Sequence, residues 1–327
     1  MDVSHGASSL EHIQRETAQM SDLNKGGYVL VTAAYNEESL IEQVIQSVVG
    51  QTRVPVKWII VSDGSTDRTD EIVDTYAVRY PFIQLLSLKT LHKRNFGAQV
   101  DAINQGCMQL KCLKYDYIGN LDADVSFDPN YFAELLKRFE NDPRLGLAGG
   151  FITEERHGVF RNRKRNKSDS VAHAVQLFRR ECFETLGGYI PLKYGGPDWH
   201  AGVVARMKGW RVQSIPELSV RHHRPTGTAD TWQRDCFRQG CMDFCLGSHP
   251  VFEVIKCARR IPDKPRMVGS LTRLFGFVWC YWSGEAREVS REFMEFLREE
   301  QMTRVRALFM PWRFRSSDDR LSTMSFE

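Results

Sequence analysis

The feature that most constrains the fold is a regular alternation of short apolar runs with segments of helical periodicity. Apolar, β-branched runs of this length predict buried strands, whereas apolar residues at helical spacing predict amphipathic helices. The predicted strands cover residues 28–35, 56–62, 81–88 and 115–124, and the helices between them cover residues 36–52, a segment capped by Asp67, and residues 95–110. Strands that alternate with helices in this way form βαβ units with right-handed connections and a mainly parallel sheet.

The pattern loosens after Gly146. The predicted elements there are strands over residues 145–151 and 172–180, a helix followed by a strand over 197–212, another strand over 216–223, and mostly helices from Thr231 onward. We therefore expect an α/β fold, with a mixed, mainly parallel sheet flanked by helices and with a C-terminal helical extension. The expected organisation is a polar tail over residues 1–26, an α/β domain over residues 27–228 and the helical extension over residues 229–327.

Charge and apolar content exclude several functional classes. The net charge of +3 gives no general affinity for nucleic acid. No apolar run reaches the roughly 20 residues that span a bilayer, and residues 1–27 lack the apolar core of a signal peptide. Cys236, Cys241 and Cys245 suggest a metal site, but reduced thiols packed in or near helices are the favoured interpretation. We therefore expect a cytosolic protein.

Polar clusters follow three of the four predicted strands: YNEE after the first, DGSTD after the second and DAD at the end of the fourth. In parallel α/β sheets, ligands bind beyond the carboxyl ends of the strands, so these clusters are expected to meet in one pocket. Asp122 and Asp124 are separated by one residue. Such a pair suits Mg²⁺ or Mn²⁺, which take one or two protein carboxylates and complete their shells with phosphate oxygens and water.

Five segments occur in a specific order: VTAAYNEE, VSDGSTDRTDEIV, LDADV, LFRRECFETLGGY and GGPDWHAGVVARMKGW. In their order and spacing they resemble the inverting family 2 glycosyltransferases, which have the GT-A fold. The resemblance covers roughly residues 27–225 and departs from the family at Ala34, where relatives often have proline. It implies a Rossmann-like GT-A catalytic domain over residues 27–228 that transfers a sugar from a nucleotide-diphospho-sugar.

The resemblance assigns the nucleotide to the ends of the first two strands. Thr32, Ala34 and Tyr35 would hold the base and ribose through backbone groups and an aromatic ring. Glu37 would contact the ribose region. Asp63 would accept a hydrogen bond from the imide N–H of uracil, which implies a UDP-sugar donor; the alternative is a turn-forming aspartate in D-G-S.

The same resemblance implies further contacts to the donor diphosphate. Arg94 matches a basic position that faces the nucleotide in relatives, although an ordinary exposed arginine is the alternative. Asp122 would touch the ribose or a metal-bound water, and Asp124 would bind Mn²⁺ or Mg²⁺ directly. Many GT-A enzymes complete the metal shell with a histidine, which implies His222 or His223; a histidine pair on the surface or in the core is the alternative. The ion would neutralise the departing diphosphate.

Inverting transfer requires a base that removes the proton of the acceptor hydroxyl. The family has this aspartate at the start of the helix after the GGY turn, which implies Asp198; at a helix start it is also a candidate N-cap. Two residues are assigned to the acceptor. Gly188 allows the backbone to approach a ligand closely, and Trp199 suits stacking on a sugar ring, although a core tryptophan is equally consistent.

Two further segments suggest contact with phosphates or with a membrane. Residues 156–167 contain six Lys or Arg residues and no acid, which suits lipid phosphates, an acceptor diphosphate or a solvated loop. Residues 268–315 contain an apolar stripe at helical spacing, and Trp312 and Phe314 alternate with arginines. This pattern is typical of a helix at an anionic membrane surface. Packing against the catalytic domain or a second subunit explains the stripe equally well.

We therefore expect a metal-dependent inverting glycosyltransferase that moves a sugar from a UDP-sugar to a lipid-linked or polysaccharide acceptor, as a peripheral protein on the cytoplasmic face of the membrane. The segment WQRDCFRQG lacks the last tryptophan of the Q-x-x-R-W motif of processive synthases, which favours single-sugar transfer. One alternative is a sugar-1-phosphate nucleotidyltransferase, whose glycine-rich loop is absent from TAAYNEE. The other is a non-catalytic nucleotide-sugar-binding subunit of a glycan assembly complex, against which the retained aspartates argue.

Overall fold

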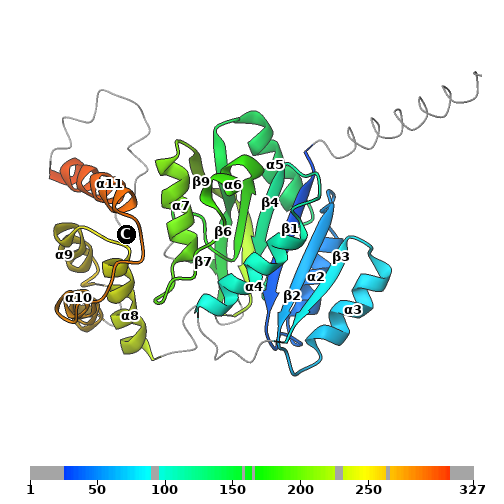
Figure 1. The fold of residues 1–327 in the computed structure, drawn as a ribbon, viewed down its shortest axis with the longest axis horizontal. Helices are drawn as coiled ribbons and strands as arrows, with labels where there is room; N and C mark the ends of the chain where they lie inside the picture. Colours follow the sequence, from blue (N-terminus) through cyan, green and yellow to red (C-terminus); the bar gives the residue numbers. More distant parts are fainter. Residues whose placement is uncertain are drawn as a thin grey trace, which may run out of the picture.

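A nine-stranded mixed sheet lies at the centre of the part of the chain that the structure describes, with helices on both faces (Figure 1). The structure is a computed structural model, and it describes residues 26–89, 96–156, 159–163, 166–224, 231–262 and 266–309. The strand order is β3-β2-β1-β4-β8-β6-β9-β5, and β7 pairs with β6. The predicted α/β fold with a C-terminal helical extension is confirmed. The predicted tail over residues 1–26 lies, except for Gly26, outside the described residues.

The parallel half of the sheet is formed by the alternating segments that the sequence predicts. All of its strand pairs are parallel: β1 (Tyr28–Ala34) lies between β2 (Lys57–Asp63) and β4 (Tyr117–Leu121), and β3 (Ile83–Leu88) pairs with β2. The connecting helices are α2 (Ile41–Val49), α3 (Thr69–Arg79) and α4 (Phe96–Gln109). The carboxyl ends of β1, β2 and β4 therefore meet at one edge of the sheet.

Alternation along β1 allows one strand to contribute to two hydrophobic cores. Tyr28 and Leu30 belong to a cluster that includes α2 and α5 (Tyr131–Asn141), whereas Val29 and Val31 belong to a cluster that includes α4. All four side chains are at most 1% exposed. Burying an apolar side chain of this size stabilises the fold by about 1.5–3 kcal/mol relative to leaving it exposed. The sheet is thus held between two layers of helices.

The second half of the sheet contains both parallel and antiparallel pairs. Its strands are β5 (Val125–Phe127), β6 (Leu145–Arg156), β7 (Val159–Asn162), β8 (Val175–Arg179) and β9 (Arg211–His222). β8 is antiparallel to β4 and β6, β6 is parallel to β9, and β5 is antiparallel to β9. The helices α6 (Arg180–Leu186) and α7 (Pro197–Met207) lie between β8 and β9 in the chain.

The prediction of two separate strands around Pro216 is wrong, because β9 is one strand with a shift in its register. Between Gly150 and Phe151 of β6 the partner in β9 changes from Ile215 to Ser219. Gly150 permits this bulge, since a Cβ at that position would lie 2.3 Å from the carbonyl oxygen of Leu218. A local pattern shows the interruption at proline, which has no N–H to donate, but it does not show that the chain continues in the same strand.

Four helices form the C-terminal extension: α8 (Trp232–Cys245), α9 (Pro250–Arg259), α10 (Arg266–Trp282) and α11 (Arg291–Phe309). The backbones of α8 and α10 are in close contact at Gly240. A Cβ added to this glycine would lie 2.0 Å from the carbonyl oxygen of Arg273. The domain boundary predicted near residue 228 falls in residues 225–230, outside the described part of the chain. Within the described residues, no helix combines the length and the apolar character that crossing a bilayer requires.

Part of the apolar stripe of α11 is covered by the α/β unit. Phe293 and Leu297, each 2% exposed, pack with Val203 and Val204 of α7. Packing against the α/β unit therefore explains this part of the stripe, whereas Leu308 and Phe309 at the end of the helix are exposed. Trp312 and Phe314, the residues that alternate with arginines, lie outside the described residues.

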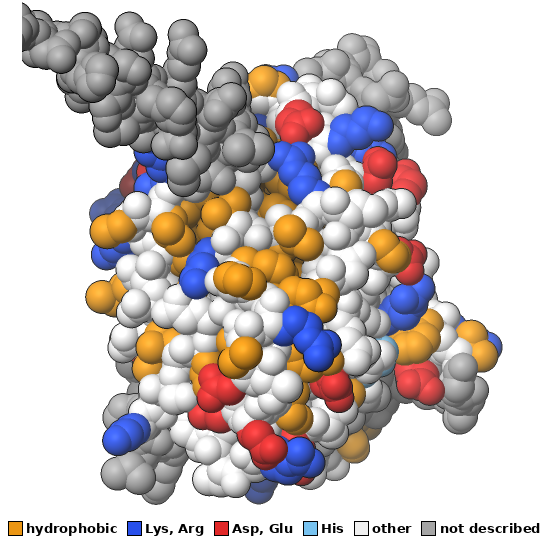
Figure 2. Space-filling model, turned by 90° about the vertical axis from the view of Figure 1, so that its right-hand side faces the viewer, with side chains coloured by type: hydrophobic (Ala, Val, Ile, Leu, Met, Phe, Trp, Pro, Cys, Tyr) orange, Lys and Arg blue, Asp and Glu red, His pale blue; other side chains and the backbone are white. Residues whose placement is uncertain are grey.

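A different helix exposes an apolar face. In α10 the exposed fractions of five large apolar residues lie between 50% and 75%, and their spacing of three or four places them on one side: Val268, Leu271, Phe275, Trp279 and Trp282. At the opposite end of the molecule, β3 forms the edge of the sheet. Figure 2 shows that side, where hydrophobic side chains gather in the middle of the face and charged ones are scattered around them.

Candidate active site

The loops after β1 and β2 are joined by hydrogen bonds. Asn36, which has a left-handed φ of 53°, accepts a hydrogen bond from the Thr66 N–H through its side-chain oxygen at 2.8 Å. The Glu37 N–H donates to Thr69 Oγ1 at 2.8 Å. The predicted helix start at residue 36 is wrong, because these contacts hold the loop outside the helical conformation and α2 begins at Ile41. Two of the three predicted polar strand ends are thus in direct contact.

Asp122, Asp124 and His222 form a compact group beyond the end of β4. β5 pairs with β9 so that Val125 lies opposite His222, which brings the histidine beside the turn that contains the two aspartates. One ligand atom from each of the three residues lies within 4.8 Å of the other two. His222 Nε2 is 3.2 Å from Asp124 Oδ1. Among the described residues, this is the one group of three or more His, Cys, Asp or Glu side chains that could hold a metal ion.

The two neighbouring histidines have different surroundings. His223 Nε2 lies 2.7 Å from Ser126 Oγ, and its ring packs edge-on against Phe160. Burial alone would lower the pKa of His222, but its close contact with Asp124 raises that pKa overall. The structure therefore brings His222, and not His223, to the carboxylate pair.

One oxygen of Asp124 suits a cation. The Asp124 side chain is 12% exposed, and its Oδ1 receives no well-oriented hydrogen bond from any residue that the structure describes. Buried carboxylate oxygens normally have a donor. A divalent cation would satisfy this oxygen, and oxygen ligands together with imidazole are a suitable set for Mn²⁺. The residues present therefore fit a divalent metal ion.

Arg224 neutralises part of this acidic group, and the sequence patterns did not reveal it. Its guanidinium donates two hydrogen bonds to Glu37, at 2.9 and 2.6 Å, and lies 3.9 Å from Asp124 Oδ2. Glu37 is 7% exposed. A fork of two charge-assisted hydrogen bonds holds both side chains in one orientation. The sequence feature that could have pointed to Arg224 is the run RHHR, residues 221–224, at the end of a predicted strand.

His173 links the carboxylate pair to Asp198, and it was also missed. His173 Nδ1 lies 3.1 Å from Asp122 Oδ1, and the His173 backbone N–H donates to Asp198 Oδ2 at 3.1 Å. Burial alone would lower the pKa of His173, but attraction to Asp122 raises it overall. For Asp122, burial alone would raise the pKa, and attraction to His173 lowers it overall. Asn120 of β4 fixes the segment by donating to the His173 carbonyl oxygen at 2.7 Å.

Asp198 is the second residue of α7 and not its N-cap. The N-cap position belongs to Gly196, which has a φ of 89°, and Pro197 begins the helix. No side-chain cap is formed there. The prediction that Asp198 caps the helix is wrong, because its carboxylate instead accepts the hydrogen bond from His173.

The predicted nucleotide-binding residues have different exposures. Thr32 is fully buried, and its Oγ1 accepts a hydrogen bond from Trp58 Nε1 at 3.0 Å. Its side chain therefore belongs to the core, and the residue is paired with Ile60 two positions before the end of β1. Ala34 is buried, whereas Tyr35 is 40% exposed. Asp63 is the last residue of β2.

Three further residues were predicted to contact the donor or the acceptor: Arg94, Gly188 and Trp199. Arg94 lies outside the described residues. Gly188 has a φ of 92°, a conformation that side chains with a Cβ rarely adopt. Trp199 packs edge-on against Phe293 of α11, with ring centroids 6.3 Å apart.

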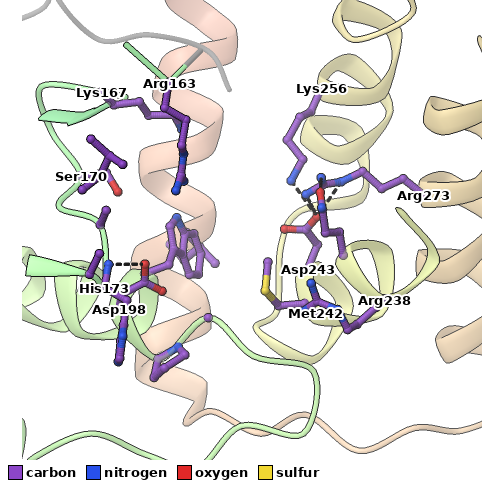
Figure 3. A pocket seen from close by; sticks show the side chains of 18 of the residues that line it. Arg163, Lys167, Ser170, His173, Asp198, Arg238, Met242, Asp243, Lys256 and Arg273 are labelled. Atoms are coloured by element: carbon purple, nitrogen blue, oxygen red, sulfur yellow. Dashed lines mark hydrogen bonds and ion pairs between the residues drawn. The ribbon is translucent and has the colours of Figure 1, made fainter. Parts of the chain in front are cut away.

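One cavity of about 460 Å³ connects the carboxylates with the helical extension. Asp122, Asp198, Trp199 and His222 contribute to its lining. Figure 3 shows His173 and Asp198 together, joined by their hydrogen bond, with side chains of the helical extension on the far side of the space. The described residues that were predicted for the donor, the acceptor or the metal and are not part of this lining are Thr32, Ala34, Tyr35, Glu37, Asp63, Asp124 and Gly188.

The chain matches the profile of Glycosyl transferase family 2 over residues 29–196, about half of its length. The chain belongs to this family. It is therefore a glycosyltransferase, as the sequence predicts. The matched segment includes Asp122 and Asp124 but ends before Asp198 and the helical extension.

Two similar relatives of this family 2 enzyme are bacterial synthases. Over 124 residues it is 32% identical to a poly-beta-1,6-N-acetyl-D-glucosamine synthase of Staphylococcus aureus (strain COL) and 29% identical to the synthase of the same name from Staphylococcus epidermidis. The matched part is 38% of this chain and 28% of each relative. The chain thus spans well under half the length of the curated relatives it matches.

The fold of this family 2 glycosyltransferase resembles those of solved GT-A enzymes. A mannosyltransferase from Pyrobaculum calidifontis, in complex with GDP-Man and Mn²⁺, gives a TM-score of 0.51 at 18% identity, with 88% of this chain and 81% of that chain covered. TarS from S. aureus, in complex with UDP-GlcNAc, gives a TM-score of 0.50 at 12% identity, with 88% and 87% covered. At these identities the likeness concerns the fold alone.

Proposed function

We propose that this family 2 enzyme is a metal-dependent inverting glycosyltransferase that moves a sugar from a UDP-sugar to a hydroxyl of a lipid-linked or polysaccharide acceptor. The observation that supports this most directly is the grouping of Asp122, Asp124 and His222, of which Asp122 and His222 line a cavity together with Asp198. The names of similar proteins point the same way, since they include a synthase of poly-N-acetylglucosamine and complexes with UDP-GlcNAc or Mn²⁺.

Asp124 and His222 would hold Mn²⁺ or Mg²⁺, with Asp122 as a further ligand or as a contact to metal-bound water. Imidazole favours Mn²⁺ over Mg²⁺. The cation would supply positive charge for the diphosphate that leaves. Arg224, 3.9 Å from Asp124, is the protein's own positive group at the same place.

The nucleotide would lie over the carboxyl ends of β1 and β2. Asp63 would accept a hydrogen bond from uracil, the exposed ring of Tyr35 would pack on the base, and the backbone of Thr32 and Ala34 would complete the contact. Glu37, already oriented by its arginine partner, would reach the ribose. Arg94 completes the proposed donor site.

Asp198 would act as the base of the reaction. The acceptor oxygen forms a bond to the anomeric carbon, the bond from that carbon to UDP breaks, UDP leaves with the electron pair, and the hydroxyl proton passes to Asp198. Attack from the side opposite UDP inverts the anomeric configuration. The hydrogen bond from the His173 backbone holds the carboxylate in place, and Trp199 and Gly188 would contact the acceptor.

A nucleotidyltransferase is the less favoured alternative, because TAAYNEE contains no glycine-rich phosphate loop. A binding subunit without activity is the other alternative. Release of UDP from a UDP-sugar distinguishes a glycosyltransferase from both alternatives. A binding subunit, in particular, releases nothing.

The proposed location is the cytoplasmic face of a membrane, with residues 27–228 as the catalytic domain and residues 229–327 as the extension that contacts lipid. The support is the exposed apolar face of α10, which contains Trp279 and Trp282, and the exposed Arg266 at the start of that helix. Apolar and aromatic residues beside cations suit an anionic interface. The wild type should float with phosphatidylglycerol vesicles, and a Trp279→Ser, Trp282→Ser double variant should not. Trp232→Ser, on α8, is the control and should still float. Equal flotation of the wild type and both variants contradicts the proposed location.

The donor site is tested by titrating UDP into the protein by calorimetry, with and without Mn²⁺. The wild type should bind UDP more tightly with Mn²⁺, and Asp124→Asn should remove that gain. Asp128→Asn is the matched control, because Asp128 is an exposed carboxylate four residues after Asp124 and is paired with Arg221. If Asp124→Asn and wild type respond equally to Mn²⁺, the proposed metal site is wrong.

A further inference from the structure

The cavity that reaches Asp198 has a strongly basic end. Eight Lys or Arg side chains contribute to its lining, together with four carboxylates. Two of those carboxylates, Asp122 and Asp198, belong to the catalytic end. The remainder of the wall therefore has eight cationic side chains and two acidic ones, Asp243 and Glu300, and three more carboxylates, Asp169, Asp235 and Glu253, pair with these cations. The cations remain in excess.

These cations come from segments that are far apart in the chain. Arg163 and Lys167 lie in the connection between β7 and β8, whereas Lys256 belongs to α9 and Arg273 to α10. Figure 3 shows the first two on one side of the cavity, the side that also holds Asp198, and the last two on the opposite side, where both are paired with Asp243. A solvated helix face would direct its charges away from the protein, but these side chains face a common space.

Ion pairs behind the wall hold several of the cations in place. Arg206 is paired with Glu300, with contacts of 2.8 and 3.0 Å. Arg304 donates to Asp169 at 2.8 Å, and its buried Nε has no hydrogen-bond partner within the described part of the chain. Guanidinium groups fixed in this way need little further ordering when an anion binds, which favours binding.

The positive potential of this region is visible in Lys167. Burial is the main reason that the pKa of Lys167 falls to about 8, and the nearby Arg304, Lys256 and Arg260 lower it further, while Asp169 acts in the opposite direction. Burial by itself would disfavour an anion as well, so only the effect of Arg304, Lys256 and Arg260 on Lys167 reflects the positive charge of this end of the cavity.

We propose that this basic end binds a phosphate group of the acceptor, an inference that rests on the proposed transfer to an acceptor hydroxyl at Asp198. An acceptor held there by its phosphate would extend through the same cavity and present its hydroxyl to Asp198. The volume of about 460 Å³ is suitable for a phosphate and one or two sugar or polyol units. The acceptor is thus a phosphorylated molecule, and not a neutral glycan alone.

The test titrates inorganic phosphate into the protein by calorimetry in the presence of EDTA, so that no metal takes part. The wild type should show saturable binding. A double variant, Arg163→Gln with Lys167→Gln, should bind roughly 10- to 100-fold more weakly, because each lost charged hydrogen bond is significant at a buried site. The charge-preserving double variant, Arg163→Lys with Lys167→Arg, should retain binding. Arg291→Gln, which removes an arginine that is 88% exposed on α11, is the matched control and should bind as the wild type does.

Two results would overturn the inference: no saturable phosphate binding by the wild type, or equal binding by the wild type and the Gln double variant. Thermal melting of each variant verifies that it is folded, and the charge-preserving pair separates loss of charge from loss of structure. The UDP titration with Mn²⁺ is performed on the same wild-type preparation. If it fails while phosphate binding persists, the proposed donor site is wrong and the basic site stands.

A second arm identifies the source of the phosphate. Vesicles of phosphatidylcholine with phosphatidic acid are compared with vesicles of phosphatidylcholine alone. The wild type and the Gln double variant are both tested with Trp279→Ser and Trp282→Ser added, so that α10 does not bind the vesicles. If the wild type floats with phosphatidic acid and the Gln double variant does not, a lipid headgroup enters the site. If both proteins float equally while their phosphate titrations differ, the inference holds for a soluble phosphorylated acceptor.

Discussion

Replacing Arg273 by methionine tests the buried charges behind the cavity wall. Arg273 donates to Asp243 and to Glu253, and Lys256 Nζ lies 2.8 Å from an oxygen of each carboxylate. All four side chains are at most 8% exposed. Two cations and two anions balance in this group. Removing the arginine leaves one buried negative charge without compensation.

The expected magnitude follows from the ionisation of Asp243. Burial alone would raise its pKa, but attraction to Arg273 and Lys256 lowers the pKa from 3.8 to about 2. That difference, 3.8 minus about 2, corresponds to about 2–3 kcal/mol in favour of the charged form. Removing one partner of a buried ion pair costs about 3–5 kcal/mol, and methionine keeps most of the apolar packing. We therefore expect Arg273→Met to lower the free energy of unfolding by about 3–5 kcal/mol at pH 7.

The free energy of unfolding is measured by urea denaturation, followed by far-ultraviolet circular dichroism. Arg291→Met, which removes an exposed arginine paired with Glu295, should produce no measurable change. Adding Asp243→Asn to Arg273→Met restores the charge balance, so the double variant should be more stable than Arg273→Met alone. Because the folded-state pKa of Asp243 is depressed, this stabilisation is present above pH 4 and is lost as the pH falls through about 2. A cost below about 1 kcal/mol, or a double variant as unstable as the sum of its single changes, would refute the reasoning.

Three further predictions concern catalysis, pH and helix packing. Asp198→Asn should lower the rate of sugar transfer by roughly 10²–10⁴ while UDP binding with Mn²⁺ persists; a rate near that of the wild type contradicts its role as base. Sulfate, whose charge is constant between pH 7 and 9, should bind the basic end more weakly as the pH rises, because Lys167 loses its proton near pH 8; constant affinity by calorimetry excludes Lys167 from the site. Gly240→Ala should destabilise the protein by about 1–3 kcal/mol, because the added Cβ would lie 2.0 Å from a carbonyl oxygen of α10. Gly202→Ala in α7, where the nearest atom to the added Cβ is 3.7 Å away, is the control and should melt no lower than the wild type.

Local patterns predicted the parallel half of the sheet well. The apolar residues of β1 and the helical spacing in α2 reflect burial on one side of each element, and burial of this kind repeats within a few residues. The same argument located Asp122 and Asp124, because parallel strands end at one edge and polar side chains there are exposed to a ligand. Element boundaries were less accurate: α2 begins at Ile41 and not at residue 36, since contacts with the next loop compete with the helix.

The stripe in α11 shows where such patterns stop being informative. Periodicity states that one side of a helix is apolar, but a membrane, a second subunit and the rest of the chain all bury apolar area equally well. The structure covers Phe293 and Leu297 with α7 and leaves Trp279 and Trp282 of α10 exposed. The larger apolar surface available to a partner is therefore on α10, although Leu308 and Phe309 at the end of α11 are also exposed.

The sequence by itself determined the order of strands and helices, the meeting of the polar strand ends and the carboxylate pair, because each depends on residues close together in the chain. The tertiary structure decided which distant residues join them. His173 is 51 positions from Asp122, and Arg224 is 187 positions from Glu37. It also decided that cations from the β7–β8 connection and from α7 to α11 face one cavity. The physical reason is that strand register and the packing of whole surfaces fix these contacts, and both are set by the total burial of the folded chain, which no short segment encodes.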